Sequence, residues 1–559
     1  MKKPAEQQLS HQRSVSSINN HHTTTSTLRT LLTNSPSKTH STTTTTITLA
    51  SPKPTTTAHT PRADDQKRAP APAQPRKYHI LTNAGKPVWS TEKEDENRPD
   101  GDLTSQMGLI QAVISIFELD DNDQLRYIDA GQSKIAVMSR PPLYFLAVSN
   151  WGEPESTLRI HLEYLNLLVQ SILSTTQLKK IFAQRPNYDL RGALSGTEAI
   201  FAGLVDRLQW DLSIMMASLV VYRCPPLLRA RISKLITPSL THPSPDHPDS
   251  LASTLLYSIV ITQAQVVSVV RPKNHSVHPS DLQIILTTIL SSKSIKSSES
   301  WIPICLPGYN PTGFLHAYVN FEPGIDVGLV LISKDRAGFY EAQRWSEAIF
   351  KDPVWAEFDR LHAPLPASSS SPSVSPSPSS SSTATSSSKT PRPDPPLTNS
   401  PCGHYLLEEL GIPGLRHFVY KDKKAVQLSA PAWEHDYLLP ANRQRLMANY
   451  QLAFDLIHPK QPKLIKKIHP EPGGQPPPVD TDLDSAAFSS AASLPPPLKF
   501  TLFKTPFESV IGWITEASEI YVTVSPLISK SASIVIVHSV ISWVKAHHSS
   551  LFLTTTNQF

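Results

Sequence analysis

The most regular feature of the chain is one order of apolar runs and amphipathic stretches that occurs three times. In the first copy, from 77 to 182, this order predicts two short strands, a helix, three strands and two closing helices. The same order returns at about 252–350 and about 415–553. The sequence therefore predicts one small α/β module that is used three times in a single chain.

The first copy opens with a predicted hairpin and a helix. The apolar run 78–82 stops at Asn83-Ala84-Gly85, a turn signal, and the run 86–90 pairs back as the second strand. A charged loop follows, and then an apolar stripe at helical spacing predicts the helix. The stripe consists of Met107, Ile110, Ile114 and Phe117, with Leu109 and Val113 beside it.

Three strands and two helices complete the first copy. The runs 125–129, 134–138 and 143–148 are separated by turn residues. The last run is almost continuously apolar, which predicts a strand that is buried on both faces near the centre of the sheet. Pro154 then opens a long amphipathic helix, and 177–182 predicts a short one.

Core packing is the general explanation for the apolar positions in these stripes. The first helix of the module is the exception that matters for function. In a five-stranded antiparallel sheet with one helix on a face, the sheet edge and the flank of that helix remain available for pairing with another chain.

The second and third copies follow a segment, 189–236, that has a helical pattern. Its part from 214 to 221 is apolar nearly all round, so we expect it to be buried between modules. The uncharged run 251–270 is long enough to cross a membrane, but its polar and β-branched residues predict two paired strands instead. The other predicted strands lie at about 301–305, 313–320, 326–333, 415–421, 424–430, 498–504, 509–515 and 519–525. One further helix is predicted to start at Pro279, and three more are predicted at about 337–350, 441–457 and 529–547.

Three stretches rich in Ser, Thr and Pro, at 1–76, 363–400 and 459–497, divide the chain. They hold too few apolar groups to offset the entropy lost on ordering, so we predict that they are disordered. The expected division is a tail at 1–76, a first domain at 77–188, a helical connector at 189–236, a linker at 237–250, a second domain at 251–362, a linker at 363–400, and a third domain at 401–559 with an insert at 459–497.

Composition and motifs argue against several classes of function. The 52 basic and 47 acidic residues leave a net charge of +5, which does not indicate a nucleic-acid-binding protein. Cys224, Cys305 and Cys402 are far apart in sequence without metal-ligand spacing, which predicts a reducing compartment and buried thiols rather than a disulfide framework. No G-x-S-x-G, phosphate-binding loop or paired-carboxylate motif occurs, so the sequence predicts no catalytic residue, no metal site and no cofactor.

Several longer motifs resemble one known family. They include YHILTNAGKPVWS, RPPLYFLAVSNWGEPESTLRIHLEYLNLLVQSILSTTQLKKIFAQRPNYDLR, GTEAIFAGLVDRL and EIYVTVSPLISKSASIVIVHSVISWVKAHHSSLFL. They are similar, in the same order, to the Mon subunit of the Mon–Ccz complex, the vacuolar fusion protein Mon-one family. The resemblance covers roughly 77–350 and 403–553, and the low-complexity tail and inserts fall outside it. It implies an α/β (α+β) fold of three longin modules, each a five-stranded antiparallel sheet with one helix on one face and two on the other.

The resemblance also implies a function. In that family the first longin domain pairs with its counterpart in the Ccz-type subunit, and the joined surface binds a late-endosomal and vacuolar Rab GTPase and releases its GDP. The other domains form a scaffold that meets membranes carrying phosphatidylinositol 3-phosphate. We therefore expect a cytoplasmic heterodimer, peripheral on late endosomes, multivesicular bodies and vacuoles, that acts in vacuole and autophagosome fusion.

Such an exchange factor needs no nucleophile, so its site is expected to be a surface. We place the GTPase contact at Trp89, Gln106, Leu109 and Gln111, with an ordinary helix surface as the competing explanation. A basic cluster that could contact anionic lipid consists of Lys460, Lys463, Lys466 and Lys467, with a plain soluble loop as its alternative. A non-catalytic longin adaptor or tether that binds SNARE or coat proteins remains the alternative function.

Overall fold

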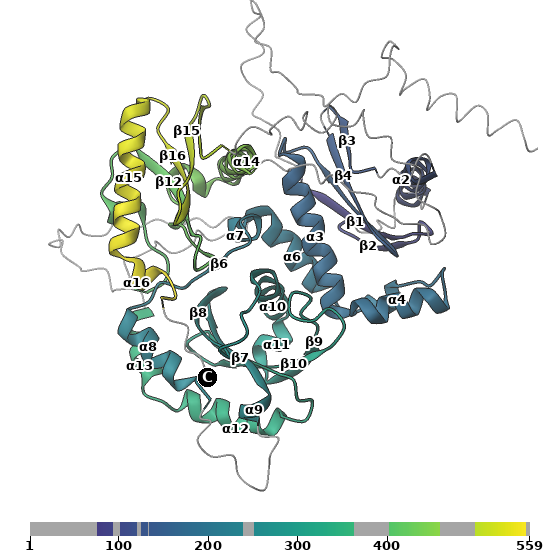
Figure 1. Cartoon of the computed structure of the whole chain (residues 1–559), viewed down its shortest axis with the longest axis horizontal. Coiled ribbons are helices and arrows are strands. Elements are labelled where there is room, and N and C mark those ends of the chain that lie inside the picture. The colour runs from purple at the N-terminus through teal and green to yellow at the C-terminus, as the bar shows by residue number, and fades with distance from the viewer. Residues whose placement is uncertain are drawn as a thin grey trace, which may run out of the picture. The chain divides into compact units, whose positions relative to one another are not determined.

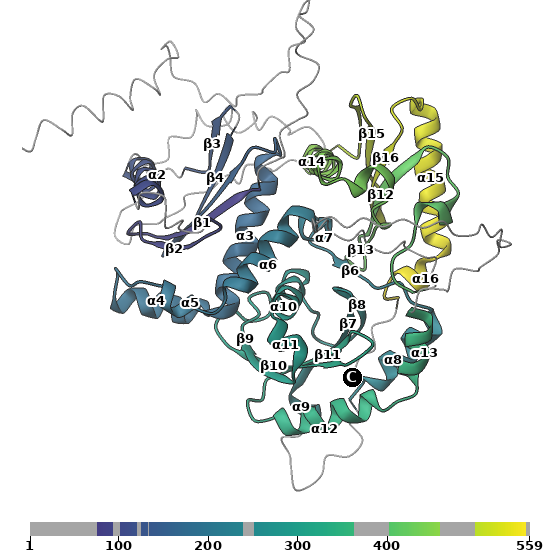
Figure 2. The same cartoon turned by 180° about the vertical axis from the view of Figure 1, so that it is seen from behind.

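The computed structural model describes residues 75–92, 101–119, 125–131, 133–238, 251–362, 402–458 and 498–554. These residues contain three β-sheets, each with helices packed on both of its faces (Figure 1, Figure 2). The predicted linkers 237–250 and 363–400, the insert 459–497 and nearly all of the predicted tail lie outside the described residues, apart from 237 and 238. The three sheets correspond to the three predicted copies of one module.

The first sheet has the strand order β2-β1-β5-β4-β3, with every neighbouring pair antiparallel. Its strands are β1 (Lys77–Thr82), β2 (Pro87–Ser90), β3 (Tyr127–Ala130), β4 (Ser133–Arg140) and β5 (Leu143–Ser149). Helix α2 (Gly101–Leu119) covers one face, and α3 (Glu155–Ile172) with α4 (Thr175–Gln184) covers the other (Figure 1). The predicted elements of the first copy are confirmed, with shifts of a few residues at their ends.

Strand β5 lies at the centre of this sheet and is buried on both faces, as its apolar run predicts. Phe145 and Ala147 pack into the core on the α3 side. Tyr144 and Leu146 point the other way, into the smaller core under α2. The alternation follows from the two-residue period of a strand.

The second sheet has the order β8-β7-β11-β10-β9 and is also antiparallel. Its strands are β7 (Leu255–Thr262), β8 (Gln265–Val270), β9 (Ser300–Ile304), β10 (Leu315–Glu322) and β11 (Val327–Ser333). Helix α10 (Pro279–Ser291) packs on one face, and α12 (Phe339–Phe350) and α13 (Val354–His362) pack on the other. The short helices α9 (Leu251–Thr254) and α11 (Lys293–Ser297) and helix α13 were not predicted from the sequence.

The uncharged run 251–270 forms the hairpin that the sequence predicts. Strands β7 and β8 pair across a turn at Gln263 and Ala264, and both of these residues adopt left-handed backbone conformations, with φ of 45° and 63°. None of the helices that the structure describes is both long enough and apolar enough to cross a membrane.

The third sheet has six strands in the order β14-β15-β16-β12-β13-β6, of which the third module contributes the five predicted strands and the connector contributes the sixth. Its strands are β12 (Leu415–Asp422), β13 (Gln427–Ser429), β14 (Phe500–Lys504), β15 (Ser509–Ile514), β16 (Ser518–Val524) and β6 (Leu219–Val220). Strand β6 comes from the connector and pairs in parallel with β13. Helix α14 (Pro440–Ile457) covers one face, and α15 (Lys530–Ala546) with the single turn α16 (His548–Leu551) covers the other; the 3₁₀ turns η1 (Leu407–Leu410) and η2 (His435–Leu438) precede α14.

The sequence predicts a helical connector at 189–236, but the structure shows that this segment also contains a strand. Its helices are α5 (Arg191–Leu194), α6 (Glu198–Trp210), α7 (Leu212–Met215) and α8 (Pro226–Leu235), with β6 between the last two. A short, uniformly apolar run does not distinguish a buried helix from a buried strand, and here the free edge of β13 decides the conformation. The expectation that 214–221 is buried is confirmed for most of its residues.

Candidate functional site: the outer face of helix α2

Helix α2 carries apolar side chains on two sides. On the inner side, Ile114 is 2% exposed and Ile110 packs beside it on the small core of the first sheet. On the outer side, Leu109 is 55% exposed and Ile116 is 53% exposed, with the exposed Ala112 between them. Positions i, i+3 and i+7 share one face of a helix, so these three residues form an outward apolar stripe, called here the α2 stripe.

The sequence around the stripe is free of charge. From Gly108 to Phe117 the helix reads GLIQAVISIF, without one acidic or basic residue. A solvent-facing helix in a monomeric protein normally carries charged groups on its outer face. An uncharged helix that is apolar on both sides is typical of a helix that becomes buried on both sides.

A local contact holds α2 in this position. The side-chain amide of Gln111 donates to the backbone carbonyl of Asn83, in the β1–β2 turn, at 2.8 Å. Gly85 in the same turn has φ of +76°, and a Cβ atom there would lie 3.2 Å from Cγ of Gln111. The turn residue is therefore a glycine for two reasons, its left-handed backbone and the close approach of α2.

The first sheet is open at both edges among the described residues, and β3 forms one of them. It is four residues long, and Asp129 and Ala130 are exposed. Asp129 uses a carboxylate oxygen to accept from the N–H of Gly131 at 2.9 Å, which closes the β3–β4 turn. The outer side of β3 offers unpaired backbone groups to a further strand.

The structure brings together only some of the predicted GTPase-contact residues. Leu109 lies in the α2 stripe, and Gln111 is half-buried against the turn. Gln106 lies within α2, but its side chain is outside the described part of the molecule. Trp89 lies on the opposite face of the sheet, where its ring stacks on Phe201 of α6 at 4.9 Å between centroids. The prediction that Trp89 shares one surface with Leu109 is therefore wrong.

Trp89 pairs with Ile80 of β1, whose side chain lies in the core on the α3 side, so Trp89 faces that core. The sequence alone does not show which residue of β1 is the partner of Trp89, and therefore does not show which face Trp89 takes. Conversely, Ala112 and Ile116 were missed, although an uncharged helix with more apolar residues than one stripe needs carries the necessary signal.

The second module shows how the chain covers the same face of its own sheet. Helix α10 holds the position in the second module that α2 holds in the first, and helices α6 and α3 pack against it. Ile284 of α10 is fully buried and belongs to the core cluster of the first module. Gln283 beside it donates to the hydroxyl of Ser213 at 2.9 Å and to the carbonyl of Ser218 at 2.8 Å. In this module, helices from outside the module bury the outer face of the helix.

The third module shows a weaker version of the exposed arrangement. On α14, Leu452 is 41% exposed and Leu456 is 40% exposed, one helical turn apart. An adjoining side of the same helix is covered, because the buried Gln451 contacts Arg76 of the first module. The α2 stripe is thus the more exposed of the two helix faces.

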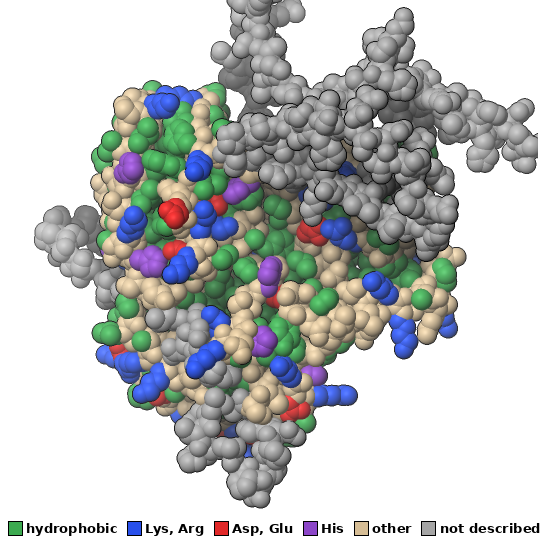
Figure 3. Space-filling view, viewed as in Figure 1, with side chains coloured by type: hydrophobic (Ala, Val, Ile, Leu, Met, Phe, Trp, Pro, Cys, Tyr) green, Lys and Arg blue, Asp and Glu red, His purple; other side chains and the backbone are tan. Residues whose placement is uncertain are grey.

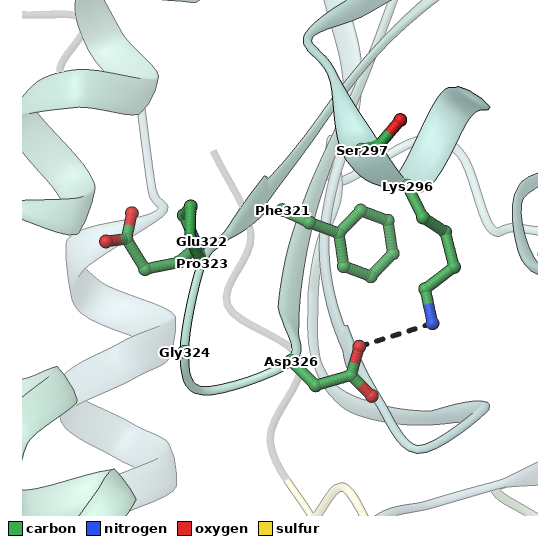
Figure 4. A pocket seen from close by; sticks show the side chains of 7 residues that line it. All are labelled: Lys296, Ser297, Phe321, Glu322, Pro323, Gly324 and Asp326. Atoms are coloured by element: carbon green, nitrogen blue, oxygen red, sulfur yellow. Dashed lines mark ion pairs between the residues drawn. The ribbon is translucent and has the colours of Figure 1, made fainter. Parts of the chain in front are cut away.

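A hollow of about 350 Å³ beside β10 contains Lys296, whose Nζ lies 3.2 Å from a carboxylate oxygen of Asp326 and 5.3 Å from the ring centroid of Phe321 (Figure 4). Lys296 and Asp326 therefore pair with each other, whereas Glu322, which also lines the hollow, points away from them (Figure 4). Among the residues that the structure describes, no group of His, Cys, Asp or Glu is arranged to hold a metal ion. Over the face seen in Figure 3, basic and acidic side chains are interspersed among apolar ones.

Comparison with known proteins identifies the modules. Three family models match in chain order, described as the first, second and third longin domains of FUZ, MON1 and HPS1, over residues 76–204, 253–351 and 414–548. A relative named vacuolar fusion protein MON1, from Cryptococcus neoformans, is 35% identical over 481 residues, which is 86% of this chain and 65% of the relative. The chicken protein named vacuolar fusion protein MON1 homolog A is 30% identical over 86% of this chain and 72% of its own length. The chain belongs to the MON1 family.

Membership of the MON1 family makes each module a longin domain, as the resemblance implied. The human protein with the name vacuolar fusion protein MON1 homolog A is 29% identical over 482 residues, which is 85% of this chain and 60% of the human protein. This chain therefore spans less than two thirds of the length of these fungal and human relatives. The predicted lipid-contact residues Lys460, Lys463, Lys466 and Lys467 lie outside the described residues.

Proposed function

We propose that this chain is one subunit of a two-protein guanine-nucleotide exchange factor for a late-endosomal and vacuolar Rab GTPase. In this proposal it acts in endosome-to-vacuole traffic and in vacuole and autophagosome fusion. Its partner is a Ccz-type longin subunit, and the α2 stripe with the adjoining part of the first longin domain forms the joint between the two subunits. The observation that carries the proposal is the uncharged, apolar and uncovered outer face of α2.

The second longin domain supplies the argument for the kind of partner. There the outer face of α10 is covered by α3 and α6, which belong to the preceding longin domain and its connector. The same type of helix surface on α2 has no such cover among the described residues. We infer that a helix-bearing longin domain of another chain covers it, because that is the solution this chain uses for its own second domain. The names of the relatives, vacuolar fusion protein MON1, support a role in vacuole fusion.

The proposed mechanism works through binding energy alone. A Rab holds its nucleotide through a phosphate-binding loop, Mg²⁺ and switch segments. A protein that binds the nucleotide-poor conformation more tightly than the nucleotide-bound one shifts that equilibrium by the difference in affinity. Each 1.4 kcal/mol of difference lowers nucleotide affinity about tenfold. An apolar surface formed by the two joined subunits can supply this difference without any nucleophile, acid or base.

Membrane recruitment in this proposal is peripheral. The described helices include none suited to crossing a bilayer, and the lysines at 460–467 are our proposed contact with a phosphoinositide-bearing surface. Recruitment concentrates the exchange factor where its Rab resides. It would place the protein on late endosomes, multivesicular bodies and vacuoles.

The deciding experiment measures nucleotide release from the Rab with the chain and its Ccz-type partner purified together. The variants Leu109→Asp and Ile116→Asp charge the α2 stripe without touching the core. Val535→Asp on α15 is the matched control, because Val535 is also an exposed aliphatic residue on a helix, 64% exposed. We expect the first two variants to lose partner binding and release, and the control to keep both.

Two other outcomes would redirect the proposal. Normal partner binding and normal release by both α2 variants would remove the α2 stripe from the mechanism. A stable complex with the partner that never accelerates release from any Rab tested would favour the alternative function, a longin adaptor or tether.

A further inference from the structure

Two of the three cysteines meet in one core, although the whole second longin domain separates them in sequence. Cys224 lies in the connector and is fully buried, and Cys402 lies at the start of the described part of the third domain and is 3% exposed. Both belong to the core cluster on the α12 face of the second sheet. Cys305 is also buried, but its sulfur lies against the carbonyl of Asn310 at 3.4 Å. The sequence predicts three separate thiols, and the structure pairs two of them.

A backbone hydrogen bond fixes the two cysteines side by side. The N–H of Gly403 donates to the carbonyl of Arg223 at 2.9 Å, which joins the peptide after Cys402 to the peptide before Cys224. Standard peptide geometry on either side of this bond places the two Cα atoms about 4.5 to 6.5 Å apart. That spacing lies within the range that a disulfide bridges.

The two thiols also interact directly. A hydrogen bond from Cys224 lowers the pKa of Cys402, with the positive charges of Arg223 and Arg229 adding to the effect. The same hydrogen bond, together with burial, raises the pKa of Cys224. The two thiols therefore titrate as one coupled pair beside two arginines, and reactive cysteines occur next to such cations.

Arg229 gives this pair an unusual neighbour, a buried cation without a carboxylate. Its guanidinium is 6% exposed and donates at 2.7 to 2.9 Å to backbone carbonyls of four residues, which are Tyr222, Ser549, Ser550 and Phe552. Its Nε has no acceptor, and among the described residues no acidic side chain pairs with it. Burying a cation without an anion is costly, and a thiolate of the adjacent pair supplies that anion.

We propose that Cys224 and Cys402 are a redox-active dithiol that hydroperoxides oxidise to a disulfide, with Arg229 as the positioning cation that stabilises the attacking thiolate. In the first step the sulfur of Cys402 attacks the terminal oxygen of the hydroperoxide. The O–O bond breaks, Cys402 becomes a sulfenic acid, and the alkoxide takes a proton and leaves as an alcohol. In the second step the sulfur of Cys224 attacks that of Cys402, the S–O bond breaks, and water leaves. The two thiols lose two electrons in total, and the hydroperoxide gains them.

The consequence of oxidation is a covalent loop around the second longin domain. The disulfide joins the connector to the first residues of the third domain, so the second domain and the linker 363–400 lie inside the loop. Separation of the connector from the first residues of the third domain then requires breaking a covalent bond. Oxidation is thus expected to fix the connector against the start of the third domain.

The test uses the full chain with the partner it is purified with, reduced and then treated with tert-butyl hydroperoxide. Free thiols are blocked with iodoacetamide under denaturing conditions, and peptides are mapped by mass spectrometry. We expect a peptide pair joined by Cys224 and Cys402 and an alkylated Cys305, whose pKa burial raises to about 11. Three alkylated cysteines, or a disulfide that includes Cys305, would overturn the proposal.

A second measurement detects the same disulfide by testing whether the two fragments of a cut chain stay joined. A protease site placed in the linker 363–400 cuts the chain between Cys224 and Cys402. On a non-reducing gel, the two fragments of the oxidised protein should migrate together, and the Cys402→Ser variant should separate into two bands. Cys305→Ser is the matched control and should behave as the wild type. Separation of the wild-type fragments after oxidation would contradict the proposal.

The role of the cations is read from the pH dependence of the oxidation rate. Arg229→Gln removes the proposed charge, and Arg223→Gln removes the more accessible neighbouring charge in case the first variant does not fold. We expect the pH of half-maximal rate to move upward and the rate at neutral pH to fall several-fold for both. An unchanged pH profile in the folded variants would show that these arginines are only structural and would overturn that part of the proposal.

Discussion

Arg76 and Glu153 form an ion pair in which neither side chain has any exposure to solvent, with 2.6 Å between Nε and Oε1. The guanidinium of Arg76 also lies over the ring of Trp151, 3.9 Å from its centroid, and reaches the side-chain oxygen of Gln451 at 3.4 Å. Gln451 belongs to α14 of the third longin domain. One arginine therefore links the first domain to the third from inside the protein.

The first prediction concerns this pair. Nη1 of Arg76 and Oε2 of Glu153 have no hydrogen-bond partner, so the pair is buried with incomplete compensation. Removing one member leaves an unpaired buried charge, and Glu153→Gln should lower the free energy of unfolding by about 3 to 5 kcal/mol. The double variant Arg76→Met, Glu153→Met should lose less, because no charge remains buried. Thermal unfolding of the three proteins makes the comparison, and a double variant less stable than the single one would contradict the argument.

The second prediction uses two isoleucines that lie two residues apart on α2. Ile114 points inward and is 2% exposed, whereas Ile116 points outward and is 53% exposed. Ile114→Ala should lower the free energy of unfolding of the chain by about 2 to 5 kcal/mol. Ile116→Ala should change it by less than about 0.5 kcal/mol but weaken partner binding, by roughly 30-fold if the residue is a hot spot worth about 2 kcal/mol.

Denaturation of the chain and titration of the Ccz-type partner separate these two effects. The substitution is the same at both positions, so each residue is the control for the other. An Ile116 variant that binds the partner normally would show that the α2 stripe has another use.

The sequence predicts the repeated module well because each copy combines several independent signals. Period-2 runs, turn residues such as Asn83-Ala84-Gly85, and helix starts such as Pro154 and Pro279 agree on one order of elements. The doubly buried β5 follows directly from its apolar run. The exposed position of Leu109 also follows from the sequence. The core stripe of the helix is complete without Leu109, so this residue has no place in that core.

Features that depend on contacts between modules are beyond such reasoning. Strand β6 exists because the edge of β13 lies beside it, which the local sequence of Leu219 and Val220 does not encode. The pairing of Cys224 with Cys402 likewise results from the meeting of two segments that are remote in sequence. The side of the sheet taken by Trp89 follows from its pairing with Ile80, a register that the local sequence does not reveal.

The third prediction concerns the dependence of stability on pH. Burial lowers the pKa of His417 to about 3. Its ring stacks on the ring of Trp433, and its Nδ1 lies 3.0 Å from the hydroxyl of Tyr450. In the unfolded chain the pKa of a histidine is about 6.5. Below that pH the unfolded state binds a proton that the folded state does not, so stability falls as the pH falls, down to the folded pKa. At pH 5 the loss from this residue is about 2 kcal/mol.

The variant His417→Asn tests this statement, since its side-chain oxygen can still accept from Tyr450 but does not titrate. Unfolding midpoints in urea at pH 7.5 and pH 5.0 should differ less for the variant than for the wild type. His79 titrates in the same direction, because burial lowers its pKa to about 4, so the variant should keep part of the dependence. An identical pH dependence in both proteins would show that His417 is protonated in the folded state.

The fourth prediction concerns the membrane. Lysines near an anionic leaflet contribute about 1 kcal/mol each, so neutralising Lys460, Lys463, Lys466 and Lys467 to Gln should weaken binding to phosphatidylinositol 3-phosphate liposomes by roughly fivefold per residue at low salt. Flotation of the complex at two salt concentrations measures this, and the difference from the wild type should shrink at high salt because the interaction is screened. The control replaces Lys179 and Lys180, two exposed lysines on α4 of the first longin domain. Each control substitution removes the same charge as each test substitution. If only the control loses flotation, the lipid contact lies in the first domain and not in the third.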